Sequence, residues 1–194
     1  MEAQRITINY MAGDGTRTAL SVFVSDNSYR SREIMGDDKI TLEFSLPQYT
    51  DISNAHCNIF GTDYYSFAPP QVNKFHDRSY AYTLEMYSEA HLASITMFRD
   101  IVLSYDTYGS YTGGNRISFA LTAQPKEHLR MVIDNMNYKA GLTRSSASGQ
   151  WHLGDCVDEY EKCIPYDDTT VLEALNNIAE IFDAEWEIDT EGRK

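Results

Sequence analysis

A two-residue alternation of apolar and polar side chains runs through the first half of the chain and constrains its fold most strongly. The alternation is clearest over residues 40–46, where Ile, Leu, Phe and Leu alternate with Thr, Glu and Ser. Because successive side chains of a strand point to opposite faces, this pattern predicts a strand with one buried face. Residues 36–38 before it and Pro47 after it are typical of turns. The same alternation recurs at residues 6–10, 20–24 and 80–86.

Two further features of the first half favour β structure. Residues 57–60 and 64–67 flank Gly61, which predicts a hairpin with a glycine-containing turn. Residues 90–102 fit neither period cleanly, and we interpret them as a long strand. Short, closely spaced strands of this kind are typical of a sandwich or a small barrel. The prediction is therefore a β-rich barrel or sandwich domain over residues 1–114.

The pattern changes near residue 115, where helical spacing begins to alternate with short strands. Pro125 is well placed in the first turn of a helix, whose apolar residues recur at helical spacing and which should end before Gly141. A second helix begins after Thr170, which forms a capping-box pattern with Glu173. Strands are predicted at residues 117–122, 151–153, 161–165 and 185–189.

The resulting order in the second half is strand–helix–strand–strand–helix–strand. This order predicts a ferredoxin-like split βαββαβ domain over residues 115–194, with two helices covering one face of a four-stranded sheet. The whole chain is therefore expected to be α+β, with domains at residues 1–114 and 115–194. Such a fold hosts many functions and does not by itself indicate one.

Charge limits the classes of partner. The net charge of the chain is -13, which argues against nucleic acid and against an anionic membrane surface, because both require a concentrated Lys and Arg surface. The charge is local: residues 154–194 hold 13 acidic and three basic side chains, a net charge of -10, which leaves -3 for the first 153 residues.

Neither secretion nor membrane insertion is expected from the sequence. The N-terminus lacks the basic start and apolar run of a signal peptide. No apolar stretch approaches the ~20 residues that cross a bilayer. Cys57, Cys156 and Cys163 do not make a disulfide framework, so a protein made in a reducing compartment is the simplest interpretation.

No combination of residues matches a catalytic, metal-binding or cofactor-binding motif. His152, Cys156 and Cys163 match no common zinc spacing, and no fourth ligand is evident. Cys57 follows His56 directly, and neighbours on a strand point to opposite faces, so they should not form a nucleophile–base pair. We therefore expect a protein that is not an enzyme and holds no cofactor.

Two other functions stay open. The Tyr-, Ser-, Gly- and Asn-rich segment 104–115 is either a linker or a contact loop, in which Tyr105, Tyr108 and Tyr111 would bind a glycan or another surface. Glu185 and Glu187 share one face of a predicted edge strand and could serve a hydrolase as acid and base. Solvated charge that blocks edge-to-edge pairing explains these two carboxylates better.

Three segments together resemble a known group of proteins. They are IMGDDKITLEFSLP at 34–47, FHDRSYAYTLEM at 75–86 and FALTAQPKEHL at 119–129, the last continuing to DNMN at 134–137. In this order they resemble the N-terminal region of tail proteins from prophages of Bacteroides-type gut bacteria. That group is similar to the tail-tip, or baseplate hub, proteins of long-tailed phages. The resemblance covers most of residues 30–189 and is weakest before residue 30.

The resemblance implies a structural role in virion assembly. Hub proteins of this kind form trimeric rings below the tail tube, next to the distal tail protein and the tape measure, so the implied partners are copies of the chain and other tail proteins. The implied location is the bacterial cytoplasm during assembly and then the virion tail tip. Longer members continue into cell-wall-cleaving or receptor-binding modules, and this chain is expected to end where such a module would start. No catalytic residue is implied.

Overall fold

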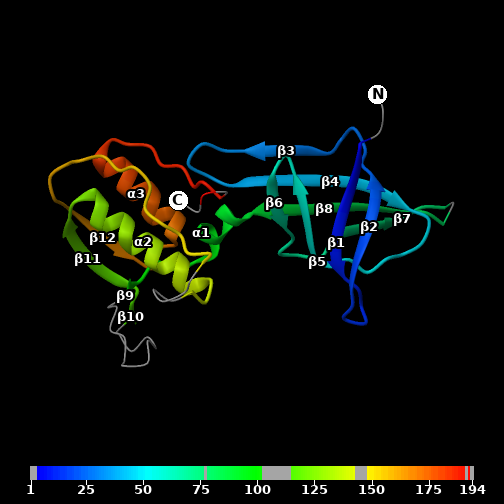
Figure 1. Ribbon diagram of the computed structural model, residues 1–194, viewed down its shortest axis with the longest axis horizontal. Coiled ribbons are helices and arrows are strands. Elements are labelled where there is room, and N and C mark those ends of the chain that lie inside the picture. The colour runs from blue at the N-terminus through cyan, green and yellow to red at the C-terminus, as the bar shows by residue number, and fades with distance from the viewer. Residues whose placement is uncertain (1–3, 77, 102–114, 143–147, 191, 193–194) are drawn as a thin grey trace. The chain divides into compact units, whose positions relative to one another are not determined.

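The computed structural model describes residues 4–76, 78–101, 115–142, 148–190 and 192 (Figure 1). It divides into two compact units, Met1–Glu89 and Ala90–Lys194. The sequence placed the boundary later, between residues 114 and 115. The difference arises because Ala93 and Phe98 are buried in the hydrophobic core of the second unit, so the segment before residue 102 belongs there.

The first unit is one antiparallel sheet that curls into a half-barrel (Figure 1). Its strands follow the order β2-β1-β5-β6-β8-β4-β3, with β7 also paired to β8. The eight strands are β1 (Arg5–Met11), β2 (Arg17–Phe23), β3 (Tyr29–Arg32), β4 (Asp38–Leu46), β5 (Ser53–Ile59), β6 (Thr62–Tyr65), β7 (Gln71–Lys74) and β8 (Tyr80–Ser88). All of the alternating segments predicted in this half are confirmed as strands.

The end of β2 also contacts β4, the strand next to the other end of the sheet, and we call this contact the seam. Just after β2, Val24 forms a single antiparallel bridge with Phe44 of β4. The N–H of Ser25 donates to the carbonyl of Glu43 at 2.7 Å. A curled single sheet therefore replaces the two stacked sheets that a sandwich would need.

One apolar face of the curled sheet forms the core of the first unit. The inward side chains of β1, β4 and β8 are buried, among them Ile8, Leu42 and Leu84. Tyr82 is buried too; its ring stacks on Phe44 with centroids 5.2 Å apart, and its hydroxyl donates to the carbonyl of Thr50 at 3.0 Å. The buried hydroxyl of Tyr82 is thus paired with backbone.

The second unit mixes helices with short strands. Its elements are α1 (Leu92–Ile95), β9 (Asp100–Ile101), β10 (Asn115–Arg116), β11 (Ser118–Ala123), α2 (Pro125–Lys139), β12 (Lys162–Asp167) and α3 (Val171–Phe182), preceded by a 3-10 turn, η1 (Glu89–His91). The long strand predicted over residues 90–102 is wrong, because η1 and α1 occupy residues 90–95 and only Asp100–Ile101 form a strand among its described residues.

Helix boundaries follow the predicted signals. α2 begins at Pro125 and ends before Gly141, which has a φ of +70°. At the start of α3 the N–H of Glu173 donates to the Thr170 hydroxyl at 3.2 Å, and the N–H of Thr170 donates to the Glu173 carboxylate at 2.7 Å. The predicted capping box is confirmed. No helix in the described part of the chain is long and apolar enough to span a membrane.

The predicted four-stranded ferredoxin-like sheet is not confirmed. β11 and β12 pair antiparallel along six positions, from Ser118–Asp167 to Ala123–Lys162. Residues 151–153 and 185–189, predicted as the other two strands, form no strand. Residues 185–189 do alternate between exposed and half-buried side chains, as predicted. Their half-buried side chains, however, pack beside the helices instead of joining a ladder.

The turn between β5 and β6 supplies a test of the first unit. Phe60 and Gly61 both have positive φ angles, 55° and 84°, as a type I′ turn requires. Phe60 is 72% exposed, so its ring contributes little packing there. Asn tolerates this conformation better than Phe, and Phe60→Asn should raise the free energy of unfolding by about 1 kcal/mol in urea titrations.

Phe60→Ala is the matched control for that substitution. It removes the same exposed ring but keeps the backbone cost of a non-glycine residue at positive φ. An equal gain in stability for both variants would show that the ring, and not the turn conformation, limits stability.

Candidate functional site

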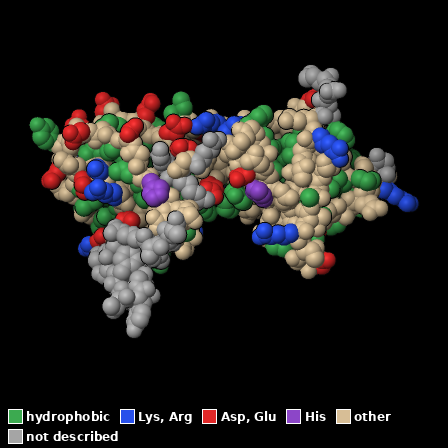
Figure 2. Space-filling model, viewed as in Figure 1, with side chains coloured by type: hydrophobic (Ala, Val, Ile, Leu, Met, Phe, Trp, Pro, Cys, Tyr) green, Lys and Arg blue, Asp and Glu red, His purple; other side chains and the backbone are tan. Residues whose placement is uncertain are grey.

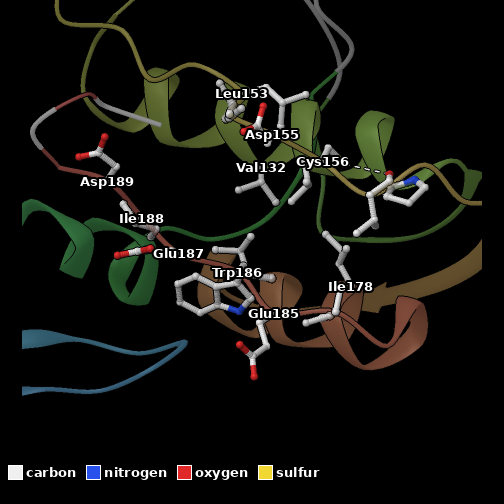
Figure 3. Close-up of a pocket in the computed structure, with 18 of the residues that line it drawn as sticks. Val132, Leu153, Asp155, Cys156, Ile178, Glu185, Trp186, Glu187, Ile188 and Asp189 are labelled. Atoms are coloured by element: carbon white, nitrogen blue, oxygen red, sulfur yellow. Dashed lines mark hydrogen bonds between the residues drawn. The ribbon is translucent and has the colours of Figure 1, made fainter.

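A cavity of about 700 Å³ lies in the second unit, between α2, α3 and two extended segments, residues 151–157 and 184–189 (Figure 3). Val132 and Met136 of α2 face it, as do Ile178 and Phe182 of α3. The lining is mainly apolar.

The two helices present this lining because each carries an apolar stripe. On α2 the stripe is Leu129, Val132, Ile133 and Met136, spaced three or four residues apart as one helix face requires. On α3 the corresponding residues are Leu175, Ile178, Ala179 and Phe182. The helical spacing of the apolar residues of α2 was predicted from the sequence. Most of these side chains are indeed buried, and all eight residues also line the cavity.

Two asparagines of α2 hold irregular segments against the helix. Asn137 accepts from the N–H of Trp151 at 2.7 Å and donates to the carbonyl of the same residue at 3.1 Å. Asn135 does the same to Arg99, at 3.1 Å and 3.0 Å, and also donates to the carbonyl of Met131 at 2.8 Å. Each amide therefore replaces the pair of hydrogen bonds that a neighbouring strand would supply. Sequence reasoning missed both roles, because the partners lie 36 and 14 residues away in the chain.

The second wall of the cavity, residues 184–189, places apolar side chains inward and carboxylates outward. Trp186 and Ile188 are half-buried, whereas Glu185, Glu187 and Asp189 are exposed. The indole Nε1–H of Trp186 donates to the side-chain oxygen of Asn176 on α3 at 3.0 Å. This hydrogen bond fixes the ring over the cavity.

Carboxylates surround the opening of the cavity. Asp155 belongs to the first wall, and Glu185, Glu187 and Asp189 belong to the second (Figure 3). Of the described residues that line the cavity, none is Lys or Arg. Figure 2 shows acidic side chains gathered over the face of this unit that carries α3 and the following segment. The cavity is thus an apolar surface inside a negative rim.

The carboxylates do not assemble an acid–base pair. Glu185 and Glu187 lie at separate points of the rim, on either side of Trp186 (Figure 3). The strand on which they were predicted to share a face is not formed.

In the described part of the chain, no cysteine is arranged with a histidine as a nucleophile–base pair. Cys57 is buried, and burial, with a smaller effect of Asp63, raises the pKa of its thiol to about 12. His56 lies instead beside Asp63, with Nε2 3.2 Å from a carboxylate oxygen, so the predicted separation of His56 from Cys57 is confirmed. Cys156 is half-buried and Cys163 exposed, and all three are free thiols.

Two further features considered from the sequence are a metal site and a tyrosine-rich contact loop. Among the described residues, no three His, Cys, Asp or Glu side chains gather closely enough to hold a metal ion. Tyr105, Tyr108 and Tyr111 lie outside the described residues.

Two titratable groups of the second unit, His128 and Tyr166, are buried and contact each other. His128 of α2 is 0% exposed. Its Nδ1 accepts from the hydroxyl of Tyr166 at 2.8 Å, and its Nε2 lies 3.3 Å from the carbonyl of Lys162. Both contacts suit a neutral ring that carries its proton on Nε2. Burial lowers the pKa of His128 below 6.5, and it raises the pKa of Tyr166. The pair ties α2 to β12.

Comparison with known protein families, with curated proteins and with solved structures gives no match. The resemblance to phage tail proteins therefore stays a prediction. Functional inference depends on the geometry of the second unit.

Asn137 allows a test of how the first wall is held. Asn137→Ala removes both hydrogen bonds to the Trp151 backbone and should lower the free energy of unfolding by about 2 kcal/mol. Asn176→Ala is the matched control, because it makes the same change on a helix but removes one exposed hydrogen bond. A urea titration that finds equal losses would contradict the role of Asn137 as a clamp.

His128 predicts a pH dependence of stability. Its folded pKa lies below its unfolded pKa, so its contribution is complete above about pH 6.5 and is lost as the pH falls through the folded pKa. The free energy of unfolding should therefore drop more steeply between pH 7.5 and pH 5 in the natural chain than in His128→Gln. Tyr166→Phe keeps the imidazole and should keep the steep dependence. Parallel profiles for the natural chain and His128→Gln would refute the assignment.

Proposed function

We propose that the chain is a non-enzymatic structural subunit of a phage tail tip, which assembles with copies of itself and with other tail proteins. It would act in the bacterial cytoplasm during assembly and then in the tail tip of the virion. The resemblance of residues 34–47, 75–86 and 119–137 supports this proposal.

The cavity of the second unit is the observation that carries the proposal. Its lining is apolar, and the described residues around it include neither a nucleophile–base pair nor a metal-binding cluster. Aromatic and Met side chains of the kind found there, such as Trp186 and Met136, are enriched where proteins bind each other. A surface built this way suits association better than chemistry.

The first unit offers a second kind of contact surface. β3 is the last strand in the order of the sheet, and end strands present backbone groups to other chains. Large aromatic side chains are exposed on this unit, among them Phe23, Tyr29, Tyr49, Phe60, Phe67 and Phe75. Phe23 ends β2 and Tyr29 begins β3, so both lie near the seam of the half-barrel. A symmetric ring would bury such edges and rings between copies.

Association is therefore the property to measure. Light scattering should show oligomers whose fraction grows with protein concentration, and co-expression with the proteins encoded beside this chain should give a stable complex. Replacing Phe23 and Tyr29 with Ser should weaken self-association by about tenfold or more, since hot-spot aromatics each contribute at least ~1 kcal/mol.

Tyr160→Ser is the control. It also removes an exposed aromatic ring, but from the second unit, where Tyr160 is 88% exposed. A chain that stays monomeric at high concentration and binds no tail protein would refute the proposed function. Specific binding to a glycan array, lost when Tyr105, Tyr108 and Tyr111 are changed to Ala, would replace it with a surface-binding role.

A further inference from the structure

We infer that the cavity between α2 and α3 binds an apolar peptide segment of a partner protein, in which Lys or Arg side chains flank the apolar residues. The inference depends on the proposed function only in taking the partner to be a protein. It adds the place of binding and the chemistry of the partner.

The apolar part of the site is already assembled. Leu129 and Ile133 on α2, Leu153 on the first wall and Trp186 and Ile188 on the second are all half-buried in the chain alone. Each keeps apolar surface in contact with water, and covering that surface is favourable. A volume of about 700 Å³ accommodates several side chains of a bound segment.

The walls are held in position before any partner arrives. Asn137 bonds both backbone groups of Trp151 at the start of the first wall. Asn176 accepts from the indole of Trp186 in the second wall. A site that is already ordered loses less conformational entropy on binding, so fixed walls favour affinity.

Charge identifies the partner. The four charged residues that line the cavity are Asp155, Glu185, Glu187 and Asp189, and all four are exposed carboxylates. A segment with Lys or Arg beside its apolar residues places opposite charges at this rim, which speeds encounter and sets register. The second unit of another copy is a poor occupant of this cavity, because it would bring the same acidic rim against this one.

The shape of the site favours a peptide over a small molecule. Two helices form the floor, and two extended segments from different parts of the chain flank it (Figure 3). Grooves between helices often bind amphipathic segments. Such segments insert apolar side chains that are alternate or helically spaced along their sequence.

The test uses the full chain and short fluorescent peptides of defined composition. A Leu/Lys peptide should bind saturably by fluorescence anisotropy and should shift the tryptophan emission of the chain. A Leu/Glu peptide of the same length should bind at least about tenfold more weakly, as should a Ser/Lys peptide. Equal binding of the Leu/Lys and Ser/Lys peptides, or of the Leu/Lys and Leu/Glu peptides, would overturn the inference.

Variants locate the binding. A combined change of Glu185→Gln, Glu187→Gln and Asp189→Asn should weaken the Leu/Lys peptide by about tenfold. Asp26→Asn, Glu33→Gln and Asp51→Asn together remove the same charge from exposed positions of the first unit and should leave binding unchanged. Equal effects of the two triple variants would overturn the assignment to the cavity.

A second pair of variants tests the apolar contacts. Leu153→Ser removes an apolar side chain of the first wall and should weaken binding, whereas Ile34→Ser makes a similar change at a site 85% exposed on the first unit. Circular dichroism checks that both variants fold. If a long-chain alkylammonium ion binds at the cavity but no peptide does, the site is a small-molecule site and the inference is wrong.

These outcomes are separable from those of the proposed function. Peptide binding without association with any tail protein would refute the phage role and leave the site intact. Association with tail proteins that Leu153→Ser and the rim variant do not affect, together with no peptide binding, would refute the site and leave the phage role.

Discussion

The second unit depends on the need to pair backbone N–H and C=O groups wherever the chain is buried without a sheet. Its main sheet has two strands, β11 and β12, which is too little to pair the segments that cross α2. Side-chain amides pair backbone groups that the two-stranded sheet does not. Asn135 offers one acceptor and one donor to the backbone of Arg99, and Asn137 does the same for Trp151, so each irregular segment gains two hydrogen bonds.

The cavity follows from that solution. A strand at residues 151–153 or 185–189 would lie in the sheet, paired with β11 or β12. These segments instead lie beside α2 and α3. The apolar surface of the two helices that lies between the two segments is therefore only partly covered. Trp186 and Ile188 approach this surface from one wall and Leu153 from the other. The negative rim is a by-product of the alternation in the second wall, which sends every second side chain, each a carboxylate, into water.

Sequence patterns predicted the first unit well because its strands are half-buried. Where one face of β1, β4 or β8 is buried, an alternation of period two follows from geometry, and the strand can be found from it. Helices α2 and α3 were found because their starts carry local signals, Pro125 and the Thr170–Glu173 box. The remaining features depend on contacts distant in sequence. Nothing near Asn137 in the sequence indicates that it bonds Trp151. An alternating segment such as 185–189 has the same sequence pattern whether it packs beside a strand or beside a helix. The candidate site, built from such segments, was therefore not predicted.

The seam of the half-barrel has a consequence for how the first unit opens. β4 and β8 are joined through eight consecutive residue pairs, whereas the end of β2 meets β4 through one bridge at Val24 and Phe44 and the adjacent Ser25 hydrogen bond. Local opening draws first on the region with the fewest interactions to break. Opening at the seam breaks only these contacts, whereas release of the β1–β2 hairpin would also break the pairing of β1 with β5 and expose Ile6 and Ile8 of the core.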